Sequence, residues 1–158
     1  KPVDNPNGEI VKMTVTTKML ESAIEVISTS DKPKDIDIAE ADVIVAVGRG
    51  ASSEAMRAQA KELADLLGGV VACTRPMVES NIFDAKRQIG LSGRTVRPKL
   101  ILTFGVSGAV QFTAGMNASD VIIAVNTDES APIFKVAHYG YVGDMYEMIP
   151  VLLESIGK

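Results

Sequence analysis

The sequence has little of several residue types on which catalytic and metal sites depend. Its 158 residues include one cysteine, one histidine and no tryptophan, and only 4% of them are aromatic. One thiol forms no internal disulfide, and one cysteine with one histidine cannot supply the usual ligand set of a zinc site. We therefore expect no metal site. We expect Cys73 to be a buried, inert thiol of an intracellular protein.

An excess of positive charge is also missing. Lys and Arg number 16 against 20 Asp and Glu, which gives a net charge of −4. Nucleic-acid-binding domains usually carry a basic patch or stacked aromatic residues, so we expect no nucleic-acid partner. The longest apolar runs are too short to cross a bilayer, and the polar start KPVDNPNGE is not a secretory signal. We therefore expect no membrane insertion.

The chain is long enough for one domain with a real core, since 46% of its residues are hydrophobic. From residue 41 onward, apolar runs alternate with helical patterns. The expected strands are 41–48, 70–75, 99–105 and 120–126, with a last extended piece within 131–143, and the expected helices are 52–69, 107–116 and 145–157. This alternation predicts an α/β fold, a doubly wound parallel sheet flanked by helices.

Other stretches are less regular. Residues 9–15 and 23–28 have the pattern of two short extended segments, and a charged connector follows them. Residues 81–98 are irregular, with a short helix before Gly90. Ser52 or Ser53 can cap the first long helix and Asp144 the last. Pro150 predicts a kink or a late start in that last helix.

Small and basic residues follow the predicted strands. In parallel α/β sheets, ligands bind beyond the carboxyl ends of the strands, near a topological switch point. A helix N-terminus offers unpaired N–H groups that suit phosphate, and arginine adds positive charge. The residues in question are Gly48–Gly50, then Thr74 and Arg75, then Gly105 with Ser107–Ala109, and then Asn126. The pattern predicts a nucleotide site at this edge.

The residues alone leave other interpretations open. Gly105 and Gly108 are also compatible with a purely structural role, in which they allow a strand to pack tightly on a helix. No G-x-G-x-x-G motif or Walker P-loop is present. Ser107 lacks a base, because the only histidine, His138, lies in a different segment. We expect no catalytic set, and a site that holds a cofactor.

Six segments occur in this order: GRGASS, TRPMV, QIGLSG, GVSGAVQFTAGM, IIAVNTDESAPIF and VAHYGYVGDMYEMIP. Together they resemble the C-terminal, FAD-binding domain of the electron transfer flavoprotein alpha subunit. The resemblance implies an FAD-binding domain at 41–158, preceded at 1–40 by the end of a truncated N-terminal domain plus linker. The sequence is similar to the branch of the family found in anaerobes. That similarity implies a cytoplasmic, prokaryotic protein that partners acyl-CoA or 2-hydroxy acid dehydrogenases.

The resemblance also implies roles for single residues. Thr74 and Arg75 occupy the place of a Ser-Arg pair that many members have. Arg75 would lie against the isoalloxazine ring and, as a fixed cation, raise the reduction potential of the flavin. Ser92 would reach flavin N5 from a turn completed by Ile89, Gly90 and Leu91. Toward the nucleotide, the implied FAD contacts are Arg49 at the pyrophosphate, Ser107, Gly108, Ala109, Val110 and Gln111 at the helix start, and Asn126, Asp144 and Met145 at the ribose or adenosine.

Three positions depart from the family pattern. Many members have Gln in place of Leu91, His in place of Phe112 and Asp in place of His138. The first two changes remove polar partners of the flavin ring. Phe112 is expected to pack in the core or against the ring, and His138 to have a structural role or to lie near the flavin or adenine.

The leading hypothesis is an FAD-binding electron carrier, an electron-transfer protein rather than a substrate-converting enzyme. It would pass electrons between a flavoprotein dehydrogenase and a second redox partner, as a heterodimer with the beta subunit of the family. The alternative is an adenine-nucleotide-binding module with a structural or regulatory role. A third hypothesis, a transferase or hydrolase that uses the glycine-rich helix start as an anion hole, suffers from the missing base.

Overall fold

The structure, a computed structural model, describes residues 8, 10–20, 26–29 and 37–157. The chain divides into two units, residues 1–34 and residues 35–158. In the described part of the first unit there is one short helix, α1 (Thr17–Leu20), and no strand. Of the two extended segments expected at 9–15 and 23–28, the described residues 10–15 and 26–28 form no strand. Residues 9 and 23–25 of those predictions lie outside the described residues.

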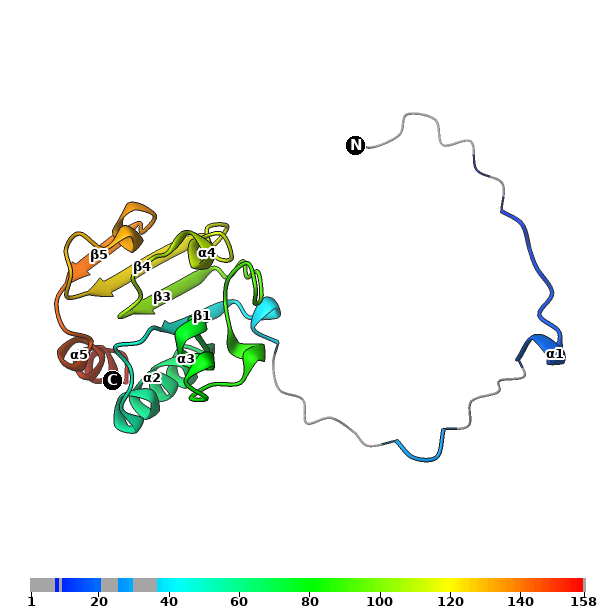
Figure 1. Cartoon of the computed structure of the whole chain (residues 1–158), viewed down its shortest axis with the longest axis horizontal. Coiled ribbons are helices and arrows are strands. Elements are labelled where there is room, and N and C mark those ends of the chain that lie inside the picture. Colours follow the sequence, from blue (N-terminus) through cyan, green and yellow to red (C-terminus); the bar gives the residue numbers. More distant parts are fainter. Residues whose placement is uncertain (1–7, 9, 21–25, 30–36, 158) are drawn as a thin grey trace. The chain divides into compact units, whose positions relative to one another are not determined.

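The second unit alternates strands and helices as predicted (Figure 1), except that Arg75, which was expected to end a strand, begins a short helix. Its strands are β1 (Val43–Val47), β2 (Val70–Cys73), β3 (Leu100–Phe104), β4 (Val121–Asn126) and β5 (Tyr139–Val142). Its α-helices are α2 (Glu54–Leu66), α3 (Arg75–Glu79), α4 (Val110–Thr113) and α5 (Met145–Ile156). Three short 3₁₀ helices complete it: η1 (Ile38–Glu40), η2 (Ala85–Arg87) and η3 (Pro132–Lys135). The helix expected before Gly90 is η2.

The five strands form one parallel sheet in the order β2-β1-β3-β4-β5. The chain passes from β1 to β2 on one side and then returns to β3 on the other side of β1. The gap between the chain segments that leave β1 and β3 is the topological switch point. Val47 is aligned with Cys73 and with Phe104, and Phe104 with Val125. The loops after four strands therefore begin at one edge of the sheet.

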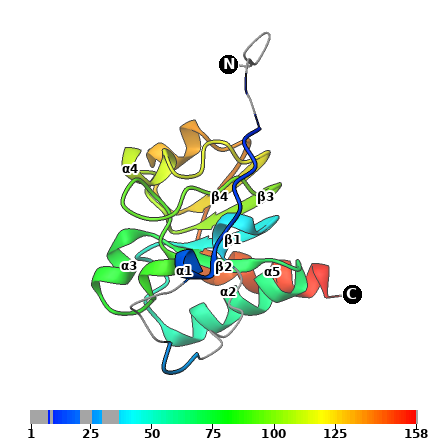
Figure 2. The same cartoon turned by 90° about the vertical axis from the view of Figure 1, so that its right-hand side faces the viewer.

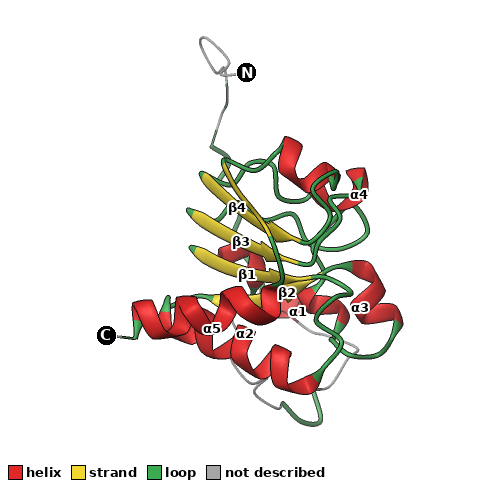
Figure 3. Cartoon of the chain, turned by 90° about the vertical axis from the view of Figure 1, so that its left-hand side faces the viewer, coloured by secondary structure: helices red, strands yellow, loops and turns green. Residues whose placement is uncertain are grey.

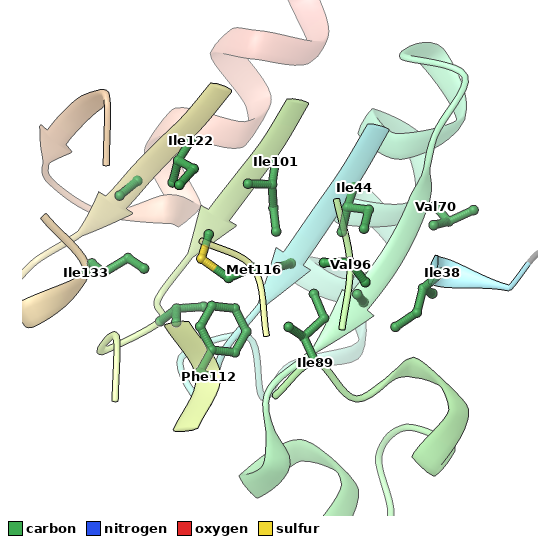
Figure 4. Close-up of a cluster of buried hydrophobic side chains, with 14 of the residues drawn as sticks. Ile38, Ile44, Val70, Ile89, Val96, Ile101, Phe112, Met116, Ile122 and Ile133 are labelled. Atoms are coloured by element: carbon green, nitrogen blue, oxygen red, sulfur yellow. The ribbon is translucent and has the colours of Figure 1, made fainter. Parts of the chain in front are cut away.

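Apolar side chains cover both faces of the sheet. On one face, α2 and α5 lie side by side, with Met56, Leu63 and Ile149 packed on the strands (Figure 2, Figure 3). On the other face, η1, α4 and η3 contribute Ile38, Phe112 and Ile133, as Figure 4 shows. Strand residues alternate between the two clusters, as the pleat requires. Helical elements on both faces confirm the predicted doubly wound fold.

The ends of the long helices follow from local hydrogen bonds. The Ser53 side chain accepts the Met56 N–H at 3.2 Å and caps α2, and Gly68, with φ of +67°, ends it. The Asp144 side chain accepts the Tyr146 N–H at 2.9 Å and caps α5. Pro150 lies inside α5, so the predicted late start was wrong. The cap at Asp144 fixes the helix start, and Pro150 removes only one backbone donor further along.

The compact unit also includes residues before the predicted domain start at 41. Ile38 in η1 is 1% exposed and belongs to the core on the α4 side of the sheet. The Asp37 side chain caps η1 by accepting the Ala39 N–H at 3.1 Å. Among the described residues, no helix is long and apolar enough to cross a membrane.

Candidate functional site: a cleft at the carboxyl ends of the strands

A cleft of about 440 Å³ opens at the carboxyl ends of the strands, where the topology predicts a site. Its volume is typical of a small-molecule pocket. Its lining comes from the loops after β1, β2, β3 and β4. The lining residues are Gly48–Gly50, Thr74–Pro76, Gly105–Ala109, Phe112, Asn126, Asp128, Ala131 and Pro132.

Glycines allow these loops to approach one another. Gly105 and Gly108 have φ of +61° and +82°, which favours glycine. A Cβ on Gly48 would collide with the Gly105 carbonyl oxygen, and a Cβ on Gly108 with the backbone nitrogen of Ile133. These contacts confirm that Gly105 and Gly108 have a structural role in packing. The same packing leaves the backbone of the loop at the surface of the cleft.

The N-terminus of α4 has open hydrogen-bond donors. Its N-cap residue, Ala109, has no side chain that could cap it. The first N–H used at this end is that of Phe112, which donates to the Ala109 carbonyl at 2.9 Å. In the described residues, the N–H groups of 107–111 have no acceptor. Three of the residues that carry these N–H groups, Ser107, Gly108 and Ala109, line the cleft.

Asn126 holds two cleft loops together. Its side-chain nitrogen donates to the Val106 carbonyl at 2.8 Å, and its side-chain oxygen accepts the Asp128 N–H at 3.0 Å. Asn126 thus connects the loop after β3 to the loop after β4. The loop that leads into α4 is fixed in place before any ligand binds.

The charged side chains of the cleft are two arginines and one aspartate. Arg49 is exposed and, among the described residues, has no hydrogen-bond or ion-pair partner. Arg75 forms an ion pair with Glu79 at 2.8 Å, with both side chains more than half exposed. Such a pair contributes only about 0.2–1 kcal/mol, so Arg75 is available to a stronger anion. Hydrogen bonds from Ser130 lower the pKa of Asp128 and keep its carboxylate charged.

The predicted turn at 89–92 lies beside the cleft and is not part of its lining. The N–H of Ile89 donates to the Cys73 carbonyl at 3.0 Å, and that of Leu91 donates to the Gln111 carbonyl at 2.9 Å. The turn therefore bridges the end of β2 and α4. Ser92 is exposed, and its hydroxyl accepts a hydrogen bond from the Gln88 side chain at 2.9 Å.

Met145 lies beneath the cleft. It is 7% exposed, and its terminal methyl group occupies the space that a Cβ on Gly50 or Gly105 would need. Tyr146 is next to it, and its hydroxyl oxygen lies 3.4 Å from the Gly50 carbonyl oxygen and 3.2 Å from the Ser53 hydroxyl oxygen. The start of α5 thus supports the two glycine loops from below.

The structure brings only part of the sequence-predicted site into the lining. Within the lining are Arg49, Thr74, Arg75, Ser107, Gly108, Ala109, Phe112 and Asn126. Outside it are Ile89, Gly90, Leu91, Ser92, Val110, Gln111, Asp144 and Met145. The lining also includes Pro76, Val106, Asp128, Ala131 and Pro132, which were not predicted from the sequence. Their positions directly after the strand ends were the signal that could have identified them.

The two rare side chains do not line the cleft. Cys73 is fully buried, and burial raises the pKa of its thiol to about 12, so it stays protonated and unreactive. The structure confirms the prediction that Cys73 is buried. The ring Nδ1 of His138 accepts the Ile122 backbone N–H at 2.9 Å, and the backbone N–H of His138 donates to the Ile122 carbonyl at 2.8 Å. These bonds give His138 a structural role where β5 meets β4.

The fold is that of a doubly wound parallel α/β domain with a cleft at its topological switch point. Residues 37–117 match the family model described as "Electron transfer flavoprotein FAD-binding domain". The match covers more than half of the chain, which therefore belongs to this family. The resemblance on which the sequence prediction rested is confirmed.

Relatives of this chain have names that agree with this family. It is 53% identical to the lactate dehydrogenase (NAD(+),ferredoxin) subunit LctC of Acetobacterium woodii, over 98% of this chain and 37% of that protein. It is 41% identical to the electron transfer flavoprotein subunit alpha of Thermoanaerobacterium thermosaccharolyticum, over 98% of this chain and 47% of the relative. Over 78% of this chain and 34% of the relative, it is 44% identical to the acryloyl-CoA reductase electron transfer subunit beta of Anaerotignum propionicum. The chain thus spans less than half of each of these relatives.

Proposed function

We propose that this chain is the FAD-binding part of an electron carrier that passes electrons between a flavoprotein dehydrogenase and a second redox partner. The observation that carries the proposal is the cleft at the topological switch point of this chain, which belongs to the family. It combines open backbone donors at α4 with two arginines. A bound FAD would supply the chemistry, since a flavin takes up and releases electrons one or two at a time.

The residues present fit the pyrophosphate of a dinucleotide. Uncapped N–H groups at the start of α4 can donate to phosphate oxygens, and the absence of a side chain on Gly108 keeps the backbone accessible. Arg49 has no competing partner in the described structure and can add a charge-assisted hydrogen bond. Asn126, with both amide atoms engaged by the backbone, would act by holding the loop in place.

The flavin ring would lie between the end of β2 and α4. Thr74 and Arg75 line the cleft there, and the turn at 89–92 borders it. Arg75 would exchange its weak ion pair with Glu79 for the ring, and its positive charge would favour the reduced flavin. Leu91 is 71% exposed, and the ring would cover apolar surface there.

The proposed partners are a beta subunit of the family and a dehydrogenase. The relative in Acetobacterium woodii is named a lactate dehydrogenase subunit, and the one in Anaerotignum propionicum an acryloyl-CoA reductase subunit. These names support a dehydrogenase for a 2-hydroxy acid or an acyl-CoA. We further propose that the FAD-binding domain is the unit of residues 35–158, which begins a few residues before the expected start at 41 because Ile38 belongs to its core, that the residues before it hold the end of a preceding domain and a linker, and that the protein is cytoplasmic.

The first experiment is a visible absorption spectrum of the purified chain after addition of FAD and removal of the excess. It is run with and without the beta subunit, and the released cofactor is identified by chromatography. The proposal predicts one FAD per chain in at least one of the two preparations, with a spectrum shifted from that of free flavin. If ADP binds as tightly as FAD and the flavin spectrum stays that of free flavin, the adenine-nucleotide module is the better description.

The substitution Arg75→Ala separates the ring from the nucleotide. It should lower the midpoint potential of bound FAD while FAD affinity falls less than about tenfold, because the phosphate contacts remain. Reductive titration measures the potential, and Lys61→Ala on the exposed surface of α2 is the control for net charge. An unchanged potential in Arg75→Ala would show that this arginine does not act on the ring.

A further inference from the structure

Gln88 is a polar residue that is 7% exposed, at the base of the turn beside the cleft. Its N–H donates to the Ala85 carbonyl at 3.1 Å, and its own carbonyl accepts the Arg94 N–H at 2.7 Å. A bridge pairs it with Cys73 at the end of β2. The backbone on both sides of this residue is therefore fixed, and its side chain starts from a defined position.

The side chain of Gln88 reaches across the turn to Ser92. Its Nε2 donates to the Ser92 hydroxyl oxygen at 2.9 Å. An amide nitrogen offers only hydrogens, so Ser92 is the acceptor in this bond. The hydroxyl proton of Ser92 has no acceptor among the described residues, and the side chain is exposed. That proton is left to point away from Gln88.

We infer that Gln88 is a positioning residue that holds Ser92 as a hydrogen-bond donor toward an acceptor atom on the ring of a bound flavin. The inference rests on the proposed function and adds to it a residue that does not itself touch the cofactor. A free serine hydroxyl rotates and can either donate or accept. Gln88 already donates to the Ser92 hydroxyl oxygen, so the hydroxyl is held as a donor before FAD binds. The entropy cost of ordering this hydroxyl when FAD binds is therefore reduced.

The composition of the turn at residues 89–93 leaves Ser92 as its side-chain hydrogen-bond donor. Ile89, Gly90, Leu91 and Gly93 have no polar side-chain atoms, so Ser92 is the side chain of residues 89–93 that can donate. The turn is tied to α4 through the Leu91 N–H and the Gln111 carbonyl, at 2.9 Å. A change at Gln88 should therefore alter the direction of one hydroxyl proton and leave the position of the turn unchanged.

The contact itself is tested without cofactor. In NMR spectra of the 158-residue chain, Ser92→Ala should shift the side-chain NH₂ signals of Gln88 and slow or speed their exchange, while the NH₂ signals of Gln59 on α2 stay unchanged. Unchanged Gln88 signals would overturn the inference at this first step, because the hydrogen bond would not exist in solution.

The role toward the flavin is tested by a double-mutant cycle on FAD affinity, measured on the chain in complex with the beta subunit. Gln88→Met and Ser92→Ala should each weaken FAD binding by about three- to tenfold, the range of one neutral hydrogen bond. The double variant should bind no more weakly than Ser92→Ala alone, because Gln88 acts through Ser92. Ser92→Thr should retain the affinity, since it keeps a hydroxyl.

The variant Gln88→Glu adds a further test to the double-mutant cycle. Gln88→Glu has only acceptor oxygens, so it should turn the Ser92 proton inward and weaken FAD binding more than Gln88→Met does. Gln59→Glu adds the same charge on α2 and should have no effect. In the Ser92→Ala background, any remaining effect of Gln88→Glu is its direct charge effect.

Two kinds of failure are distinguishable. If the wild-type complex binds no FAD, the proposed function and this inference both fall. If it binds FAD but the effects of Gln88→Met and Ser92→Ala multiply independently, Gln88 has only a structural role, and the proposed function stands without this inference.

Discussion

Two kinds of helix N-terminus occur in the compact unit. At α2 and α5, the side chains of Ser53 and Asp144 accept backbone N–H groups at 3.2 and 2.9 Å. At α4, the N-cap residue is Ala109, and no side chain takes that role. The two capped ends belong to the long helices on one face of the sheet. The start of α4 lies at the cleft, as does that of α3, whose N-cap residue Thr74 also makes no side-chain cap.

The capped helix starts contribute to the stability of the fold, whereas the uncapped start of α4 leaves donors for a ligand. A capped N-terminus has its donors satisfied within the protein, which stabilises the helix by about 1 kcal/mol. The four-residue helix α4 gives up that stabilisation and keeps donors free for an anion. Its position is secured by other means, since Asn126 and the glycine contacts hold the loop that leads into it.

The largest expected effect comes from Gly108, which supports that loop. Gly108→Ala should lower the free energy of unfolding by about 3 kcal/mol or more. It places a side chain at φ of +82° and pushes a Cβ against the Ile133 backbone. Denaturant unfolding measures the loss. The matched control is Gly68→Ala, where φ is +67° but no atom lies within 4 Å, so the cost should be about 1 kcal/mol. Equal losses would show that the contact with Ile133 is unimportant.

The next effect concerns the open end of α4. Ala109→Asp should cap the helix and place a carboxylate where the phosphates would bind, so FAD affinity should fall by at least about thirtyfold, because like charges in contact cost several kcal/mol. Equilibrium binding of FAD to the complex with the beta subunit measures it. Ala118→Asp, an exposed position outside the cleft lining, should have no effect. Retained affinity in Ala109→Asp would mean that the cofactor phosphates do not bind at α4.

The smallest effect belongs to a capped end. Ser53→Ala should lower the free energy of unfolding by about 1 kcal/mol, because the Met56 N–H loses its acceptor. FAD affinity should stay the same. Ser52→Ala is the control, since that side chain is exposed and makes no hydrogen bond in the described structure. A loss of FAD affinity in Ser53→Ala would contradict the separation of stability from binding.

The sequence predicted the strands and their ends because both depend on local patterns. Apolar runs that end in glycine or a polar residue marked β1, β3 and β4, and the residues after them do line the cleft. Contacts between distant segments were not predictable in this way. That Met145 supports Gly50 and Gly105, and that Gln88 holds Ser92, depend on how α5 and the turn pack in three dimensions. The sequence left a kink or a late start of α5 open at Pro150, and the helix start at Met145 excludes the late start.

The most direct test of the central claim is to follow backbone amide signals by NMR during an FAD titration of the chain, with the beta subunit present if it is needed for binding. The amide protons of residues 107–111 should shift strongly as FAD binds, because they gain phosphate acceptors. The amide proton of Met56, which already donates to the cap of α2, should stay in place. Saturable FAD binding that leaves 107–111 unshifted would contradict the account.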